Sequence, residues 1–326
     1  MRLQMRFFGL VSALALMFLA AAPAWAQADY PTRAVNVVVP FPPGGAADLH
    51  ARALGAALEP MFKKPLMVIN KQGAGGAVGL QYASIQKPDG YTIVVALSSL
   101  PFLYEVDKLF DRKPAYQEED FIPIALLSAD PVVITVHKDS PWKTIDEFVA
   151  DAKKRPDQIN LGSAGKYSTM HVGAELFTMA ANIKLNHIPY TGGGPSLKAL
   201  LGRHIDTAAF SPSVVMAQMQ AGTVRPLLVI GNKRLASMPD VPTTLEKGWD
   251  AEFYIWAGVF ALKGTPDPIV QKLRDSVRKA VESPEFIKAM KQMKTPIHYL
   301  DQPDFIKFIQ KDGSRTRKAV RDIGKI

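Results

Sequence analysis

The sequence predicts an α/β protein of two lobes, joined by two strands that cross between them. Short β-branched runs alternate with longer helical patterns, which is typical of α/β units on largely parallel sheets. About 300 residues follow a predicted signal peptide, more than one hydrophobic core usually supports. Two apolar strands, Ile122–Leu127 and Arg225–Ile230, have no tight hairpin partner and are predicted to be the hinge crossings.

The N-terminus has the pattern of a secretory signal peptide. Arg2 and Arg6 precede an apolar stretch from Phe7 to Ala22, and Ala24-Trp25-Ala26 supplies the small-residue exit. This stretch is shorter than the roughly 20 residues that span a membrane, so a retained anchor is the less favoured alternative. We expect residues 1–26 to be cleaved off and the mature protein to lie in the periplasm.

The elements follow from periodicity and from proline in the first turn of several helices. Strands are predicted at 35–40, 66–70, 91–97, 122–127, 132–137, 186–189, 205–210, 225–230 and 256–262. Helices are predicted at 46–62, 77–87, 144–155, 168–182, 195–202, 212–221, 268–282, 284–293 and 303–323. With crossings near 125 and 229, residues 27–125 form the first lobe, 126–228 the second, and 229–326 return to the first.

Composition limits the chemistry. The chain has no cysteine, which excludes disulfides, thiolate nucleophiles and Cys-ligated metals. Its formal net charge of +9 suits an anionic ligand or a soluble surface. The basic residues form no stripe interleaved with aromatic side chains, so we expect no nucleic-acid partner.

The first candidate binding loop is Val39–Asp48. Pro42 and Pro43 stiffen it, and Gly44 and Gly45 allow a ligand to approach the backbone. The following helix directs free N–H groups and its positive dipole end at this point, which suits a carboxylate. Asp48, in the first helical turn, is expected to act as a cap or to compensate the dipole.

Two further loops also lead into helices. Gly162–Thr169 ends in Ser168 and Thr169, whose hydroxyls could bind a ligand or could simply cap the helix. Pro189–Pro195 is glycine-rich. One loop before the first crossing and two after it are what a cleft between lobes requires.

The ordered motifs resemble those of the Bug family, the periplasmic receptors of tripartite tricarboxylate transporters. They run through the whole mature chain and comprise Tyr30-Pro31, Pro40–Gly45 with Asp48 and Arg52, Asn70 with Gly73–Gly76, Pro88–Thr92, Asp120–Ile124, Gly162-Ser163 with His171, Pro189-Tyr190 with Gly192, Asp206, Asp240–Thr243 with Glu246 and Gly248, Trp256–Gly258, and Gly264–Pro266.

The resemblance implies a two-lobed periplasmic binding protein of the Venus-flytrap kind, type II-like, that binds a small carboxylic acid and delivers it to membrane permease subunits. It implies no catalysis, cofactor or metal, and we expect a monomer. Carried over by position, the implied ligand-binding residues are Phe41, Pro42, Pro43, Gly44, Gly45, Ser98, Gly165, Ser168, Thr169, Tyr190 and Asp206.

Departures from the family pattern bear on specificity. Ser98–Leu103 replaces a segment that often holds an asparagine. Leu100 and Phe102 could therefore line the pocket with Phe41 and Tyr190 and favour an aromatic or long-chain acid, or they could be core residues. Lys166 stands where a small or neutral residue is usual, and is expected to be solvated.

Other classes of function have weaker support. Gly73-x-Gly75 begins a dinucleotide-type loop, but Val78 occupies the third glycine position. His171 and Glu175 would share a helix face, yet catalytic zinc needs three ligands. There is no Gly-x-Ser-x-Gly motif, which leaves a secreted hydrolase as a minor alternative. A ligand sensor for a membrane signalling partner remains open, because ligand-driven closure changes the surface that a partner meets.

Overall fold

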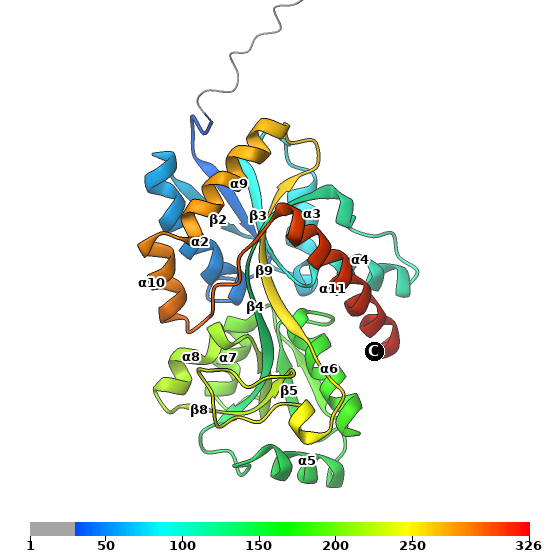
Figure 1. The fold of residues 1–326 in the computed structure, drawn as a ribbon. Helices are drawn as coiled ribbons and strands as arrows, with labels where there is room; N and C mark the ends of the chain where they lie inside the picture. The colour runs from blue at the N-terminus through cyan, green and yellow to red at the C-terminus, as the bar shows by residue number, and fades with distance from the viewer. Residues whose placement is uncertain (1–29) are drawn as a thin grey trace, which may run out of the picture.

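The computed structural model describes residues 30–326, which fold into two α/β lobes, one above the other in Figure 1. The predicted signal peptide lies outside the described residues. Within 30–326 no helix is both long and apolar enough to cross a membrane. The predicted α/β class is confirmed, because strands and helices alternate along most of the described chain.

One half of the curled sheet belongs to the first lobe. Its strands are β1 (Val35–Val39), β2 (Leu66–Asn70), β3 (Thr92–Leu97), β4 (Phe121–His137), β9 (Tyr254–Leu262) and β10 (Leu300–Asp301). The order is β2-β1-β3-β9-β4, and β10 also pairs with β4. β1, β2 and β3 are parallel, whereas β9 is antiparallel to both β3 and β4. Valine and isoleucine dominate β1 and β3, as expected for strands covered on both faces.

The other half belongs to the second lobe. It contains the last part of β4 with β5 (Asn160–Ser163), β6 (Asn186–Pro189), β7 (Thr207–Phe210) and β8 (Val224–Ile230). β7 and β8 are antiparallel to β4, while β5 runs parallel to β6 and β7. β4 is therefore common to both halves.

Ten α-helices cover these strands in the described part of the chain. They are α2 (Ala46–Phe62), α3 (Ala77–Ser84), α4 (Leu100–Leu109), α5 (Ile145–Lys154), α6 (Thr169–Ala181), α7 (Gly193–Leu201), α8 (Pro212–Gln220), α9 (Asp267–Val281), α10 (Pro284–Gln292) and α11 (Gln302–Ile323). Thr144 and Glu147 form a capping box at α5, and Ser168 caps α6. The capping role that the sequence offered for Ser168 is therefore present in the fold.

The chain changes from one half-sheet to the other within β4. Residues Phe121–Pro131 pair with β9, and Val132–His137 pair with β7 and β8. The return runs from Ile230 at the end of β8 through a long loop to Tyr254 at the start of β9. The expected crossing near 125 lies inside the first half-sheet, and the expected return near 229 lies inside the second. The lobe boundaries at these two positions stay a prediction.

Several elements differ from the expected ones, among them the short strand β10, which was not predicted. The runs 122–127 and 132–137 form a single strand, because the polar residues Ser128 and Asp130 interrupt the apolar pattern without interrupting the backbone pairing. The short strand Asn160–Ser163 was missed, since it contains glycine and little β-branched character. Leu100–Leu109 is a helix, α4, where only an apolar segment was expected.

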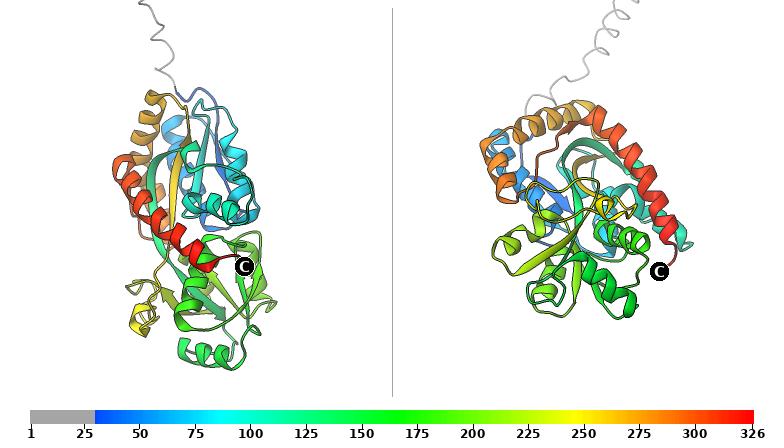
Figure 2. Two further views of the ribbon diagram at one scale, coloured as in Figure 1. Left: turned by 90° about the vertical axis from the view of Figure 1, so that its right-hand side faces the viewer. Right: turned by 60° about the horizontal axis from the view of Figure 1, so that its bottom comes forward.

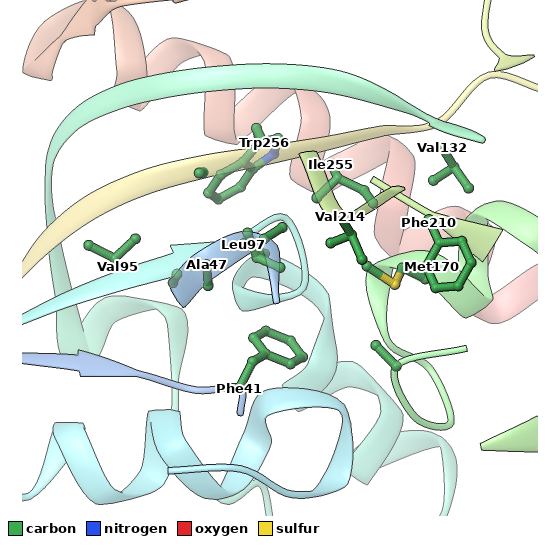
Figure 3. Close-up of a cluster of buried hydrophobic side chains, with 14 of the residues drawn as sticks. Phe41, Ala47, Val95, Leu97, Val132, Met170, Phe210, Val214, Ile255 and Trp256 are labelled. Carbon is green, nitrogen blue, oxygen red and sulfur yellow. The ribbon is translucent and has the colours of Figure 1, made fainter. Parts of the chain in front are cut away.

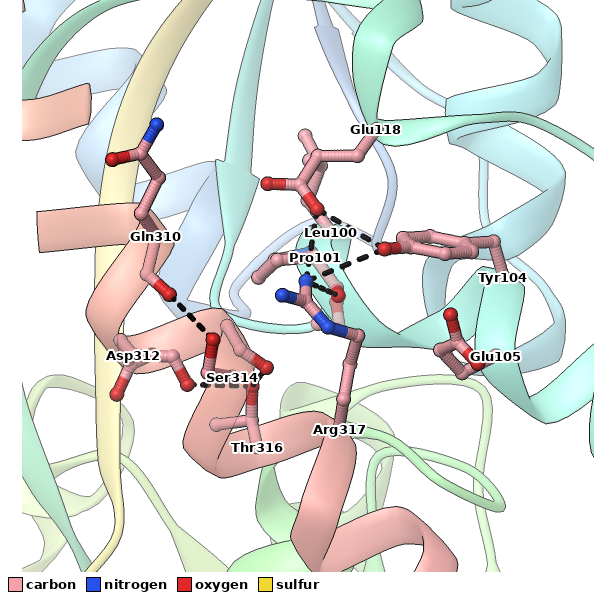
Figure 4. A network of polar contacts seen from close by, with 12 residues as sticks. Leu100, Pro101, Tyr104, Glu105, Glu118, Gln310, Asp312, Ser314, Thr316 and Arg317 are labelled. Carbon is pink, nitrogen blue, oxygen red and sulfur yellow. Dashed lines mark hydrogen bonds and ion pairs between the residues drawn. The ribbon is translucent and has the colours of Figure 1, made fainter. Parts of the chain in front are cut away.

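Helix α11 joins the two lobes at the surface. Trp256 in β9 is fully buried and donates its Nε1–H to Asp312 of α11 at 2.8 Å. Arg317 donates to the Pro101 carbonyl at 3.0 Å and pairs with Glu118, also at 3.0 Å (Figure 4). Beyond α11, the Gly324 carbonyl accepts a hydrogen bond from Tyr167 of the second lobe at 2.7 Å. Figure 2 shows α11 running along the first lobe, with its C-terminal end beside the second.

Candidate ligand-binding site

Loops of both lobes converge because the parallel strands of each half-sheet point their carboxyl ends at the other half. β4 runs from the first lobe into the second, and the pairing directions make β1, β2 and β3 run the same way. β5, β6 and β7 run in the opposite direction. Ligands of open α/β sheets bind at the carboxyl ends of strands, so the region between the lobes is the candidate site.

The first loop, Pro40–Gly45, connects β1 to α2. Gly44 has φ of +80°, a backbone conformation that residues with a Cβ rarely adopt. No side chain caps α2, and Ala46 and Ala47 in its first turn are buried. The first N–H groups of a helix have no intrahelical acceptor, so this buried end is suited to an anion.

Asp48 holds the first loop in shape. Its carboxylate accepts from the Gly44 N–H at 2.9 Å, from Arg52 at 2.9 Å and from Asn70 at 3.0 Å. Burial by itself would raise the pKa of Asp48, but these hydrogen bonds outweigh it and hold the pKa below its usual value. Asp48 thus holds the Gly44 N–H, Arg52 and Asn70 and does not cap the N–H groups of α2, so its carboxylate is occupied by the protein itself.

The second loop, Ala164–Ser168, lies between β5 and α6. Gly165 has φ of +127°, and its carbonyl accepts from the Ser163 hydroxyl at 3.1 Å and from the Ser168 N–H at 3.1 Å. The Ser168 hydroxyl accepts from the His171 N–H at 3.3 Å, which is the capping interaction expected at this position. The Ser168 oxygen is fully buried but already has a partner.

Two stacked histidines support the second loop. The rings of His171 and His187 have centroids 3.7 Å apart. His171 Nδ1 accepts from the Tyr167 N–H at 3.0 Å, which requires an unprotonated Nδ1. Since the Ser163 hydroxyl donates to Gly165, the 2.7 Å contact between His187 Nε2 and Ser163 Oγ assigns the donor role to His187. His171 therefore accepts through Nδ1, and His187 donates through Nε2.

Glycines bring the two lobes into direct contact. A Cβ on Gly192 of the second lobe would overlap Cγ and Cδ of Pro42 in the first. A Cβ on Gly75 would lie 2.9 Å from the Lys166 carbonyl, and one on Gly165 would lie 3.2 Å from the Gly75 nitrogen. The lobes thus meet at two places: Gly192 lies against the ring of Pro42 on the first loop, and the backbone of Gly75, after β2, lies against the backbone of the second loop.

Two buried hydroxyls at the strand ends have no hydrogen-bond partner among residues 30–326. Ser98 follows β3 and is 0% exposed, and Thr169 opens α6 and is 1% exposed. An unpaired buried hydroxyl costs about 1–3 kcal/mol, so these two oxygens are suited to a ligand that supplies the missing partner. Ser196 also lacks a partner, but its hydroxyl lies against Gly162 inside the second lobe.

Most of the predicted site residues lie at the facing strand ends. They are Phe41, Pro42, Pro43, Gly44, Gly45 and Ser98 from the first lobe, and Gly165, Ser168, Thr169 and Tyr190 from the second. Figure 3 shows apolar residues of this region, with Phe41 and Ala47 from the first lobe and Met170 and Val214 from the second. Tyr190 is half-buried and lines a cavity of about 530 Å³ between the lobes, together with Gly75, Leu103 and Gly165.

The structure places the remaining sequence-predicted residues as follows. Asp206 is exposed at the amino end of β7, the end of the strand remote from the first lobe, and accepts the Asn160 N–H at 2.8 Å. The structure does not bring it together with the other candidates. Leu100 and Phe102 are 1% and 0% exposed and belong to the hydrophobic core, which favours the core alternative over a pocket lining. Lys166 is exposed, as expected.

Sequence reasoning missed two features of this region. The contact of Gly75 with the Gly165 loop was not foreseen, although Gly73–Gly76 stood out as a motif. Asp130 was also missed, although a single acidic residue inside the apolar run of β4 is visible in the sequence. No group of three His, Asp or Glu side chains placed to hold a metal ion occurs among residues 30–326.

Acid is expected to destabilise the protein through His187. Burial, with the neighbouring His171 and Lys166, lowers the pKa of His187 to about 3. Below about pH 6.5 the unfolded chain binds a proton that the folded protein does not, so the free energy of unfolding falls with pH towards 3. His187→Gln keeps a donor for Ser163 and should lose less stability between about pH 7 and about pH 4 in urea unfolding. The exposed His204→Gln is the control, and equal losses in both variants would contradict the assignment.

Comparisons with known proteins agree with this architecture. The family model described as tripartite tricarboxylate transporter family receptor matches residues 50–325. Protein BugT of Bordetella pertussis is 31% identical over 308 residues, 93% of each chain. The periplasmic binding protein BugD is similar in structure, with a TM-score of 0.84 and 31% identity over 90% of this chain and 99% of its own. MatC of Rhodopseudomonas palustris, solved with bound malate, has a TM-score of 0.81 and 28% identity over 89% of this chain and 99% of its own.

Proposed function

The chain belongs to the tripartite tricarboxylate transporter receptor family and is a solute receptor, and we propose that it binds a small organic carboxylate between its lobes and passes it to membrane permease subunits. The family is one of periplasmic binding proteins. We place the mature protein in the periplasm after cleavage of residues 1–26, as a monomer. Its role in this proposal is binding without catalysis.

The main support for a carboxylate is the pair of unpaired hydroxyls beside helix N-termini. Ser98 precedes α4, and Thr169 opens α6 on the other lobe, so the two oxygens belong to opposite walls. The uncapped start of α2 adds N–H donors and a positive dipole end. A ligand with acceptor oxygens at both ends would pair with groups of both lobes and hold them together. Malate, the ligand of MatC, has this form.

The proposed site consists of the first loop with Ser98 on one wall, and of Gly165, Ser168, Thr169 and Tyr190 on the other. It leaves out Asp206, because the strand end that carries Asp206 faces away from the first lobe. The histidines below the second loop support its backbone. His171 Nδ1 is engaged by the Tyr167 N–H, which leaves that nitrogen unable to act as a general base.

A thermal-shift screen of the purified mature protein tests the proposal. Small dicarboxylates and monocarboxylates should raise the melting temperature, since a ligand at 100 times its dissociation constant adds roughly 2.7 kcal/mol of stability. Uncharged amides of the same acids serve as controls of equal size and should have no effect. A shift with the amides but not with the acids, or no shift with any acid, would contradict the proposal.

A further inference from the structure

Asp130 lies on the inner face of the strand that joins the lobes. Side chains alternate along a strand, so Ser128, Asp130 and Val132 share one face of β4. The Ser128 hydroxyl contacts His50 of α2 at 2.7 Å, in the first lobe. Val132 packs on α6 of the second lobe, where a Cβ on Gly173 would lie 2.7 Å from its Cγ2. Asp130 is thus placed between the two lobes, on the side where their helices α2 and α6 lie.

The opposite face of the strand is occupied by α11. Ala129 pairs with Trp256, whose indole nitrogen donates to Asp312 of that helix. Asp130 pairs instead with Ile255, and paired residues of antiparallel strands project to the same side. Figure 3 shows Ile255 and Val132 in the region that also contains Phe41, Met170 and Val214. The Asp130 side chain therefore lies on the inner face of β4, with Ile255 and Val132, and not on the face that α11 covers.

The Asp130 carboxyl group has no partner within the described chain. The residue is 2% exposed, and its side-chain oxygens take part in none of the side-chain hydrogen bonds or ion pairs of residues 30–326. Burial raises its pKa to about 7, with no basic group to oppose the shift. Burying an unpaired carboxylate is costly, so such a group is rare in a folded protein unless something else supplies the counter-charge.

The titratable groups on the neighbouring elements are already engaged. In α2, Asp48 pairs with Arg52, and His50 donates its Nδ1–H to the Ala46 carbonyl at 2.7 Å and accepts from Ser128. Burial lowers the pKa of His50, which keeps the ring neutral. In α6, His171 lies 3.3 Å from Glu175. Helix α8 carries no titratable side chain, and Lys198 of α7 is exposed. None of these groups supplies a cation to Asp130.

We propose that Asp130 determines specificity by binding the ammonium group of an amino dicarboxylic acid. The inference rests on the proposed function, because it assumes that the ligand's carboxylates bind the helix N-termini and hydroxyls of the two lobes. An ammonium group on the carbon chain between those carboxylates would pair with Asp130, which no cation of residues 30–326 neutralises. Formation of this pair ionises Asp130 and releases its proton.

Matched ligands test the role of Asp130. Succinate and aspartate differ only by the amino group, as do glutarate and glutamate, and malate carries a hydroxyl in its place. Calorimetry on the mature protein should show tighter binding of the amino acid of a pair than of its parent. Asp130→Asn is close in shape and should weaken binding of the amino acid by about thirtyfold or more, with the parent acid nearly unchanged. The affinity for the amino acid should also rise between about pH 6 and about pH 8 in the native protein and stay level in the variant.

The outcomes separate this inference from the proposed function. Binding of the parent acids or malate with no preference for the amino acids overturns the role of Asp130 and leaves a carboxylate receptor. Native amino-acid affinity in Asp130→Asn also overturns it. Absence of binding by every acid in the native protein overturns both. The melting temperature of unliganded Asp130→Asn shows that the variant is folded, and it should equal or exceed that of the native protein at about pH 8, where the buried charge is present.

Discussion

Replacing Gly192 by alanine is expected to weaken ligand binding roughly tenfold to a hundredfold while leaving each lobe folded. The φ of Gly192 is 171°, in the extended region, so alanine fits its backbone without strain. The new Cβ would overlap Pro42 of the other lobe. Overpacking of this kind costs about 1–3 kcal/mol, and here the cost arises only when the lobes meet. Calorimetry gives the affinity, and small-angle scattering shows how far the lobes close on the ligand.

A matched control is available in α2. A Cβ on Gly55 would lie 3.8 Å from Leu66, an ordinary contact within the first lobe, so Gly55→Ala should bind ligand like the native protein. For Gly192→Ala the radius of gyration should change less on ligand addition than in the native protein. Native affinity in the folded Gly192→Ala variant would show that the ligand does not need the contact between Pro42 and Gly192.

Removing either unpaired hydroxyl of the candidate site is expected to weaken binding and stabilise the unliganded protein. Thr169→Val and Ser98→Ala remove oxygens that have no partner in the described chain. Without ligand, the free energy of unfolding should stay level or rise by up to about 1–3 kcal/mol. If each oxygen pairs with the ligand, the affinity should fall by about tenfold per variant. Urea unfolding and calorimetry on the same preparations measure the two effects.

Ser196→Ala distinguishes a hydroxyl of the site from a merely buried one. Its oxygen also lacks a partner, but it lies against Gly162 within the second lobe. The variant should show the same change in stability with no change in affinity. Equal weakening in Ser196→Ala and Thr169→Val would mean that loss of the hydroxyl acts through lobe packing. The assignment of Thr169 to the site would then be wrong.

Local signals explain why much of the fold was predictable. Helix α2 was predicted with its observed bounds, because Gly45 precedes a continuous helical pattern that ends at Phe62. Strands β1, β2 and β6 were also predicted to within a residue, because short apolar runs next to turn residues are local signals as well. β5 was missed, because Asn160–Ser163 becomes a strand through pairing with β6 and β7 and has little strand propensity of its own.

The candidate site was predictable only in part. Glycine-rich loops at strand ends pointed to Gly44 and Gly165, whose positive φ is a local backbone property. They also pointed to Gly192, whose need for glycine comes only from its contact with Pro42. Leu100 and Phe102 could not be assigned to core or pocket, because a buried apolar residue has the same appearance in a sequence in either place. Asp206 was carried over from a family motif, and the direction of β7 places it at the remote end of the sheet.

The sequence by itself determined the α/β class, the loops that enter helices at the strand ends, and the membership in a receptor family, since each depends on neighbours along the chain. Only the tertiary structure decided which loops meet across the lobes and which face of β4 looks inward. Asp130 illustrates the difference. The residues before and after it lie on the other face of β4, and the sequence does not say which of the two faces is the inner one. Its position between His50 on one lobe and Gly173 on the other follows from strand pairing over long distances in the chain.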